Sequence, residues 1–91
     1  MLRQPWIRQH PAEAEFKVNS FIYDFSIPKL GLLIELDSKR YHQSVRHRIR
    51  DAAKTKNAVD NGWVLKRIKI GPHLLLDVER VVVEQREISG L

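Results

Sequence analysis

Two short segments with the pattern of β-strands, separated by only four residues, restrict the fold of this chain more than any other feature. Residues 21–27 alternate large apolar side chains with smaller or polar ones, which is the two-residue period of a half-buried strand. Residues 32–37 form a second, mainly apolar segment that ends in Glu-Leu-Asp. The link at residues 28–31 contains a proline, which presets one dihedral angle, and a glycine, which tolerates positive φ. The sequence therefore predicts an antiparallel hairpin.

A basic helix is predicted to follow this hairpin. Ser44 can cap a helix over residues 45–60, and Asn61-Gly62 suits a left-handed cap at its C-terminal end. Four apolar residues fall roughly along one face of the helix, and arginines and lysines cover much of the rest. The four are Val45, Ile49, Ala52 and Val59.

The remaining segments complete a small α/β domain with a mixed sheet flanked by helices. Residues 15–18 predict a strand before the hairpin, and residues 63–70 predict a core strand after the basic helix. Residues 72–85 predict a last helix, although the β-branched residues 81–83 by themselves favour a strand. Because a helix precedes the strand at residues 63–70, that strand can lie parallel to a neighbour through a right-handed crossover.

The hairpin register gathers acidic side chains. If Ile27 and Leu32 are opposed at the turn, paired positions sum to 59. Asp24 then lies directly across from Glu35, with Cβ atoms about 4.5–5.5 Å apart. The two-residue period places Asp37 on the same face as Glu35. Five apolar side chains are predicted to face the other way, namely Phe21, Tyr23, Phe25, Ile34 and Leu36.

Carboxylates clustered on one sheet face repel one another, and a hard divalent cation relieves this repulsion. The cluster therefore indicates a metal site. Two simpler arrangements are the alternatives: Asp24 faces solvent, or lysines and arginines neutralise the acidic group.

A histidine and a further aspartate add to this group. His42 follows Asp37 by five residues, and imidazole is well suited to proton exchange near neutral pH. Asp51 lies in the basic helix, next to Arg50 and three residues before Lys54. It either forms an ion pair within the helix or orients and polarises His42. The other histidines, predicted to be surface or structural residues, are His10, His47 and His73.

Positive charge is concentrated in the middle of the chain. Residues 39–69 hold ten basic and two acidic side chains. Residues 1–38 hold four basic and five acidic side chains, and residues 70–91 hold two basic and four acidic ones. A concentrated basic face is typical of polyanion binders, since neutralised phosphates release condensed counterions. A solvated basic helix is the alternative. The candidate DNA-binding residues are Lys39, Arg40, Arg46, Arg48, Arg50, Lys54 and Lys56.

Composition limits the class of protein. The length of 91 residues suits a single domain, and 43% hydrophobic with 30% charged residues excludes a disordered chain. No apolar segment is long enough to cross a bilayer, and the N-terminal residues lack the apolar centre of a signal peptide. The absence of cysteine excludes disulfides and a thiolate zinc site. We therefore expect a cytoplasmic protein without membrane contact.

Four motifs, taken in order, resemble the very-short-patch-repair-like nucleases, a branch of the PD-(D/E)XK restriction-endonuclease-like fold. They lie within residues 16–70. In chain order they are Tyr23-Asp24-Phe25-Ser26-Ile27-Pro28, Leu33-Ile34-Glu35-Leu36-Asp37, Tyr41-His42, and Arg50-Asp51 followed after ten residues by Gly62-Trp63-Val64-Leu65. Homing endonucleases of the EDxHD type share this constellation.

The resemblance implies hydrolysis of double-stranded DNA with Mg²⁺, for which Mn²⁺ can substitute. It makes Asp24 the principal metal ligand and Glu35 the second acidic ligand. His42 becomes the general acid/base and Asp51 its partner. Asp37 completes the predicted catalytic set, but it stands where the wider fold has a lysine. The lysines that could replace it are Lys39, Lys54 and Lys56.

Two departures favour a homing or phage-type nuclease over a mismatch-repair nicking enzyme. The repair enzymes place a helix with a functional glutamate before the first strand, for which Glu13 or Glu15 would have to substitute here. They also bind a structural zinc through cysteines, which this chain lacks. We expect residues 1–91 to be one catalytic domain of a larger protein from a bacterial or phage-infected cell, with target choice left to another domain or to a second copy.

Two other functions are compatible with the sequence. In a non-catalytic nucleic-acid-binding module, the acidic group would be a relic or a solvent-facing patch, and DNA binding would ignore Mg²⁺. In a structural or assembly domain, the basic helix would meet an acidic protein partner instead of DNA.

Overall fold

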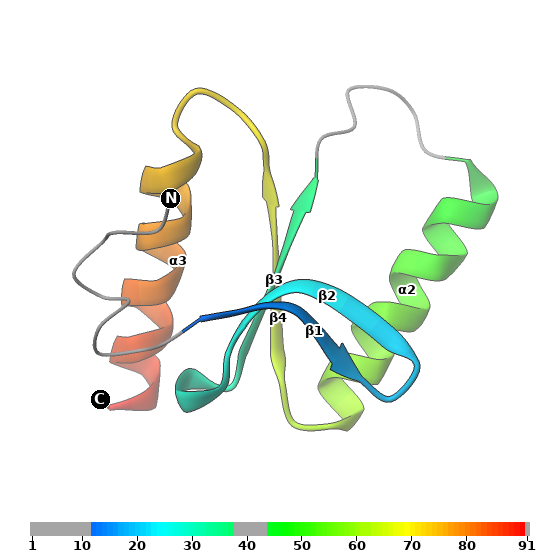
Figure 1. Cartoon of the computed structure of the whole chain (residues 1–91), viewed down its shortest axis with the longest axis horizontal. Coiled ribbons are helices and arrows are strands. Elements are labelled where there is room, and N and C mark those ends of the chain that lie inside the picture. The colour runs from blue at the N-terminus through cyan, green and yellow to red at the C-terminus, as the bar shows by residue number, and fades with distance from the viewer. Residues whose placement is uncertain (1–11, 38–43, 91) are drawn as a thin grey trace.

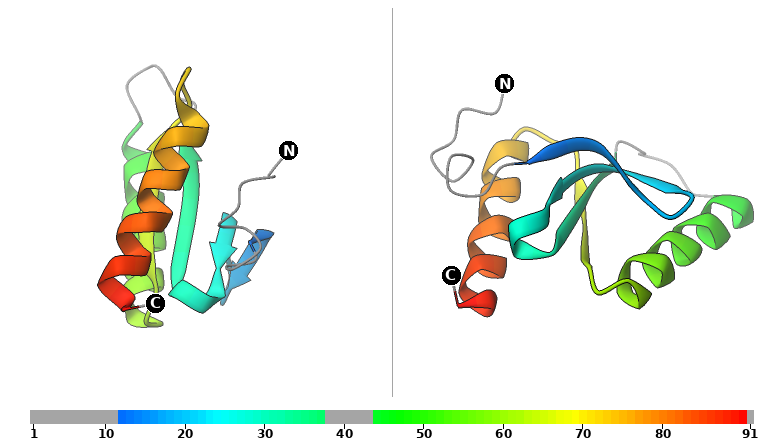
Figure 2. Two further views of the ribbon diagram at one scale, coloured as in Figure 1. Left: turned by 90° about the vertical axis from the view of Figure 1, so that its left-hand side faces the viewer. Right: turned by 60° about the horizontal axis from the view of Figure 1, so that its bottom comes forward.

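Two helices cover opposite faces of a four-stranded sheet (Figures 1 and 2). The computed structural model describes residues 12–37 and 44–90. The strands are β1 (Glu13–Val18), β2 (Phe21–Ile27), β3 (Leu32–Asp37) and β4 (Val64–Lys69), and the helices are α2 (Val45–Asp60) and α3 (Leu74–Ser89). The three pairings along the order β1-β2-β3-β4 are antiparallel, antiparallel and parallel, which confirms a small α/β domain with a mixed sheet. No helix in the described part of the chain has the length and apolar character needed to cross a bilayer.

The hairpin of β2 and β3 forms in the predicted register. Its ladder pairs Ile27 with Leu32, Ser26 with Leu33, and Phe25 with Ile34, and each pair sums to 59. A single 3₁₀ turn, η1 (Pro28–Leu30), fills the link, and the glycine after it has a φ of 62°, which glycine adopts without steric strain. The ladder ends one residue before Asp24 and Glu35 would pair.

The two faces of the sheet carry separate apolar cores. Ile27, Ile34 and Val82 are buried on the α3 side, where Phe25 and Leu36 also pack. Val18, Tyr23, Leu33 and Ala58 are buried on the α2 side, with Phe21 at their edge. The predicted orientation is therefore confirmed for Phe25, Ile34 and Leu36 and wrong for Phe21 and Tyr23.

A kink in the outer hairpin explains this switch of face. Glu15 has a φ of 51°, outside the range of regular strands, and the β1–β2 ladder omits the Glu15–Asp24 position while keeping the pairs on either side. The alternation of side chains is interrupted at Asp24. Tyr23 thus points to α2, although a regular strand would direct it to the other face.

Helix α2 has the predicted bounds and caps but buries an unexpected face. The Ser44 hydroxyl accepts a hydrogen bond from the His47 backbone N–H, as an N-cap does. Of the predicted apolar stripe, Val45, Ile49 and Val59 are 62–66% exposed. The buried residues of the helix are Lys54 and Ala58. The apolar stripe exists, but it does not attach the helix to the sheet.

Tyr23 connects β2 to α2 through its hydroxyl, which donates to the Lys54 carbonyl at 2.6 Å and accepts from the Asn57 side-chain amide at 3.2 Å. The residue is fully buried. Tyr23→Phe should therefore lower the free energy of unfolding by about 1–2 kcal/mol, because it removes two hydrogen bonds of a buried hydroxyl that join β2 to α2. Urea denaturation measures the change. A loss below about 0.3 kcal/mol would show that the hydroxyl is dispensable for attaching the helix.

Candidate functional site

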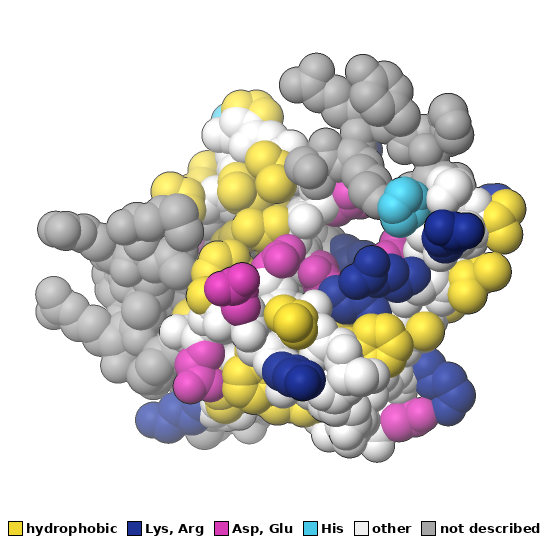
Figure 3. Space-filling view, turned by 45° about the vertical axis from the view of Figure 1, so that its right-hand side comes forward, with side chains coloured by type: hydrophobic (Ala, Val, Ile, Leu, Met, Phe, Trp, Pro, Cys, Tyr) yellow, Lys and Arg dark blue, Asp and Glu magenta, His cyan; other side chains and the backbone are white. Residues whose placement is uncertain are grey.

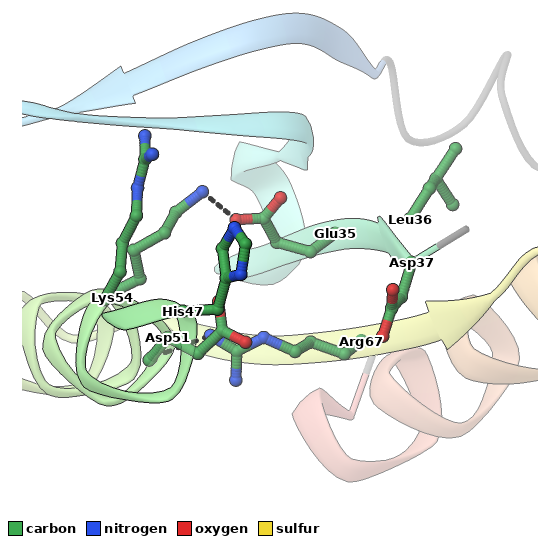
Figure 4. A pocket seen from close by; sticks show the side chains of 8 residues that line it. Glu35, Leu36, Asp37, His47, Asp51, Lys54 and Arg67 are labelled. Atoms are coloured by element: carbon green, nitrogen blue, oxygen red, sulfur yellow. Dashed lines mark hydrogen bonds and ion pairs between the residues drawn. The ribbon is translucent and has the colours of Figure 1, made fainter. Parts of the chain in front are cut away.

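A charged hollow of about 230 Å³ lies between β3, β4 and the first half of α2. It is lined by Glu35, Leu36, Asp37, His47, Arg50, Asp51, Lys54 and Arg67 (Figure 4). Acidic, basic and histidine side chains gather around a recess on this face of the molecule (Figure 3). Three of the lining residues have carboxylate side chains and three have basic ones, so the hollow presents both signs of charge to a ligand.

The alternation of β3 and the periodicity of α2 bring these residues together. In β3, Leu33 packs in the core on the α2 side, and Glu35, two residues later, reaches a lysine of that helix. In α2, His47, Asp51 and Lys54 are spaced by four and three residues, which places them on one helical face. Arg67 comes from β4, where the parallel ladder pairs it with Glu35.

Lys54 and Glu35 form an ion pair at the base of the hollow (Figure 4). Their side chains are only 11% and 15% exposed, respectively. The Lys54 ammonium also donates to the Ile22 carbonyl at 2.7 Å and lies 4.7 Å from the centre of the Tyr23 ring. Charges this deeply buried require partners of this kind. One side chain of α2 is thus bonded to both β2 and β3.

Arg67 bonds to the main chain of Asp51 and not to its carboxylate. Its guanidinium donates to the Thr55 hydroxyl at 2.8 Å and to the main-chain carbonyl of Asp51 at 2.9 Å. Lys54 pairs with Glu35, so the ion pair considered for Asp51 within its helix does not form with Lys54. Within residues 12–37 and 44–90, the Asp51 carboxylate has neither a hydrogen bond nor an ion pair, and it lines the hollow.

Asp24 lies against β3 but does not line the hollow. Its Oδ2 accepts a hydrogen bond from the Leu36 backbone N–H at 2.7 Å. The β2–β3 ladder has ended by this point, so the side chain of Asp24 takes the place of a main-chain acceptor. The Asp24 carboxylate was predicted to lie opposite Glu35. It lies beside Leu36, the next residue of the same strand.

The residues present fit a magnesium ion through their donor chemistry. No group of three or more His, Cys, Asp or Glu side chains that could hold a metal occurs in the described ranges, and His42 lies outside them. Mg²⁺ often takes only one or two protein carboxylates, with water and substrate phosphate as its other ligands. Asp24 and Glu35 supply oxygen donors of this kind on adjacent parts of two strands. Glu35 is, however, paired with Lys54.

The candidate DNA-binding residues divide into four groups. Arg46, Arg48 and Arg50 are exposed on α2, and Arg50 also lines the hollow. Lys54 is buried at the base of the hollow. Lys56 is exposed and bonded to Asp60 at 2.6 Å, and this hydrogen bond and the charge of Asp60 raise the pKa of Lys56. Lys39 and Arg40 lie outside the described residues.

Two lining residues escaped the sequence-based selection. His47 was expected to be a surface or structural residue, but it lines the hollow, with Nδ1 at 3.0 Å from the Ser44 hydroxyl. Its helical spacing to Asp51 and Lys54 was a signal that could have found it. Arg67 could not have been placed, because only the parallel register of β4 brings it beside Glu35.

Comparison of the chain with protein-family models, with curated proteins and with solved structures finds no match. The resemblance to the very-short-patch-repair-like nucleases therefore depends on the four sequence motifs alone.

Proposed function

We propose that this chain is a Mg²⁺-dependent endonuclease that hydrolyses a phosphodiester bond of double-stranded DNA. Its active site would comprise the hollow between β3 and α2 and the adjoining Asp24, whose carboxylate is bonded to the backbone of Leu36 in the lining. One observation carries the proposal. Asp37 stands where the restriction-endonuclease-like pattern has a lysine, and a lysine from elsewhere in the chain, Lys54, reaches the Glu35 carboxylate from α2. Lys54 thus places an ammonium group beside the acidic residue of β3. The small α/β domain would then be a restriction-endonuclease-like core.

Asp24 and Glu35 would hold the ion, and Mn²⁺ would substitute for Mg²⁺. A divalent ion bound there supplies stabilisation of the negative charge that develops on the phosphate and on the leaving oxygen. The chain itself would position the substrate. Arg46, Arg48 and Arg50 project from α2 and would contact backbone phosphates, contacts that position DNA without reading its sequence.

His42 would remove a proton from the attacking water. The water oxygen forms its bond to phosphorus as the bond to the 3′ oxygen breaks, which leaves a 5′-phosphate and a 3′-hydroxyl. Asp51 would hold His42 in orientation. This role is supported by the Asp51 carboxylate, which is free of partners within the described ranges and faces the hollow.

One such site cuts one strand. A double-strand break would therefore need two copies or two successive nicks. A core of this size presents few side chains that could read bases, so target choice in a homing or phage-type nuclease of this kind would come from another domain or from a second copy. Because no cysteine is present, the domain would act without a structural zinc.

Incubation with supercoiled plasmid tests the proposal. We expect nicking in Mg²⁺ or Mn²⁺ and none in excess EDTA. His42→Ala should slow nicking by about 100-fold or more, the usual contribution of a general acid or base. His73→Ala, at an exposed position before α3, is the matched control and should retain full activity. Nicking that persists in EDTA, or that His42→Ala leaves unchanged, would refute the proposal.

A non-catalytic DNA-binding module is the second candidate, and one observation favours it. Glu35 is neutralised by Lys54, and no group of three potential metal ligands gathers in the described part of the chain. This module would bind DNA with equal affinity in Mg²⁺ and in EDTA and would leave plasmid uncut, so the same experiment separates the two functions.

A further inference from the structure

The Lys54–Glu35 ion pair has a consequence for cation binding at this site. Glu35 is one of the two carboxylates that would hold a divalent ion, and its carboxylate is already in contact with an ammonium group of the chain. An ammonium and a divalent cation compete for the same carboxylate oxygens. We propose that Lys54 is a resident counter-cation of Glu35, which a divalent ion must displace, so that Lys54 sets the metal affinity of the site. This inference depends on the proposed function for its choice of ligand.

The contacts of Lys54 show why it would give up Glu35 without leaving its position. Its ammonium keeps two other partners, the Ile22 carbonyl at 2.7 Å and the face of the Tyr23 ring at 4.7 Å. Its own main-chain carbonyl is held by the Tyr23 hydroxyl. Only the bond to Glu35 faces the hollow, where a divalent ion would approach.

The ion pair also explains how Glu35 is tolerated in the absence of a metal. A carboxylate that is only 15% exposed is costly to bury without a cation nearby. Lys54 supplies that cation when no metal is bound. The same lysine would weaken metal binding, because a positive charge at ion-pair distance repels the incoming cation.

Mn²⁺ binding by the intact chain, followed by electron paramagnetic resonance of the free ion, tests this inference without measuring cleavage. Lys54→Met keeps the length of the side chain and removes its charge. We expect it to bind Mn²⁺ at least about tenfold more tightly than the wild type, since one unit charge has been removed beside the ligand. Lys54→Arg, which retains the charge, should bind like the wild type.

Two further variants locate the effect. Lys29→Met removes an exposed lysine in the turn between β2 and β3, outside the hollow, and it should leave Mn²⁺ affinity unchanged. Glu35→Gln added to Lys54→Met should abolish the gain. The inference is overturned if Lys54→Met binds Mn²⁺ no more tightly than the wild type, including the case in which neither binds. It is also overturned if the gain survives Glu35→Gln.

A measurement on the wild-type chain covers the case in which Lys54→Met does not fold. Nuclear magnetic resonance of lysine Nζ groups during a Mg²⁺ titration should show a shift of the Lys54 signal that saturates, with little change at Lys56. A Lys54 signal that stays constant at saturating Mg²⁺ would overturn the inference. Plasmid nicking is scored separately. If the chain binds Mn²⁺ and Mg²⁺ as described here but does not cut DNA, the proposed function is wrong and this inference stands.

Discussion

Asp24→Asn is expected to lower Mg²⁺-dependent nicking by about 1000-fold or more while leaving the domain folded. A loss of this size corresponds to about 4 kcal/mol of transition-state stabilisation, which is within the range that a metal site supplies. The substitution separates the two properties of this residue. Asparagine retains a side-chain oxygen that can accept from the Leu36 backbone N–H, the contact that Asp24 makes at 2.7 Å, but it carries no charge to hold a divalent cation.

Initial rates of plasmid nicking measure this effect, and thermal denaturation confirms that the variant is folded. Asp60→Asn is the matched control, because Asp60 is an exposed carboxylate whose partner is Lys56 on the outside of α2. That variant should nick at the wild-type rate. If Asp24→Asn retained more than a tenth of the wild-type rate, Asp24 would have only the structural role of accepting a hydrogen bond from β3.

Ala58→Glu is expected to destabilise the domain by at least about 3 kcal/mol, since it places a larger, charged side chain in a closely packed interior. Ala58 is fully buried between α2 and the sheet, in the cluster that contains Val18, Tyr23 and Leu33. Its small size allows the helix to approach these residues. For a domain of this length, whose total stability is typically about 5–15 kcal/mol, a loss of this size is a large fraction of the whole.

Ile49→Glu in the same helix is the matched control. Ile49 is 66% exposed, and glutamate is at least as good a helix former as isoleucine, so its free energy of unfolding should change by less than about 0.5 kcal/mol. Chemical denaturation of both variants gives the comparison. The opposite order of effects would mean that α2 packs through its apolar stripe, and the position of Lys54 in the hollow would then be wrong.

Local patterns in the sequence were sufficient for the elements and for one pairing. The bounds of β2, β3 and α2 agree with the prediction, and the hairpin pairs in the predicted register. The last helix forms despite its three consecutive valines, and it extends to Ser89, beyond the predicted end at residue 85. These features depend on residues close together in the chain, such as the turn at residues 28–31 and the Ser44 cap, and short-range rules describe them well.

The composition of the candidate site was predicted only in part. Glu35, Asp37 and Asp51 line one hollow, which the sequence had indicated. The position of Asp24 was predicted approximately: its carboxylate is beside β3 but bonded to the Leu36 backbone N–H. Lys54 was one of three lysines considered as a replacement for the missing one, and it forms an ion pair with Glu35. His42 lies outside the described residues, so its role stays a prediction.

By itself, the sequence determined the order of the strands and helices and the residues that face each other across the tight hairpin, because these depend on backbone preferences and on neighbours a few residues away. Only the tertiary structure decided which face of α2 meets the sheet. Apolar periodicity favoured the stripe with Ile49, but the helix buries Ala58 and Lys54 instead. The physical reason is that Tyr23 and Glu35, distant in sequence, give the buried Lys54 the hydrogen-bond and charge partners that it requires. The small side chain of Ala58 also lets this face of the helix approach the apolar cluster of the sheet.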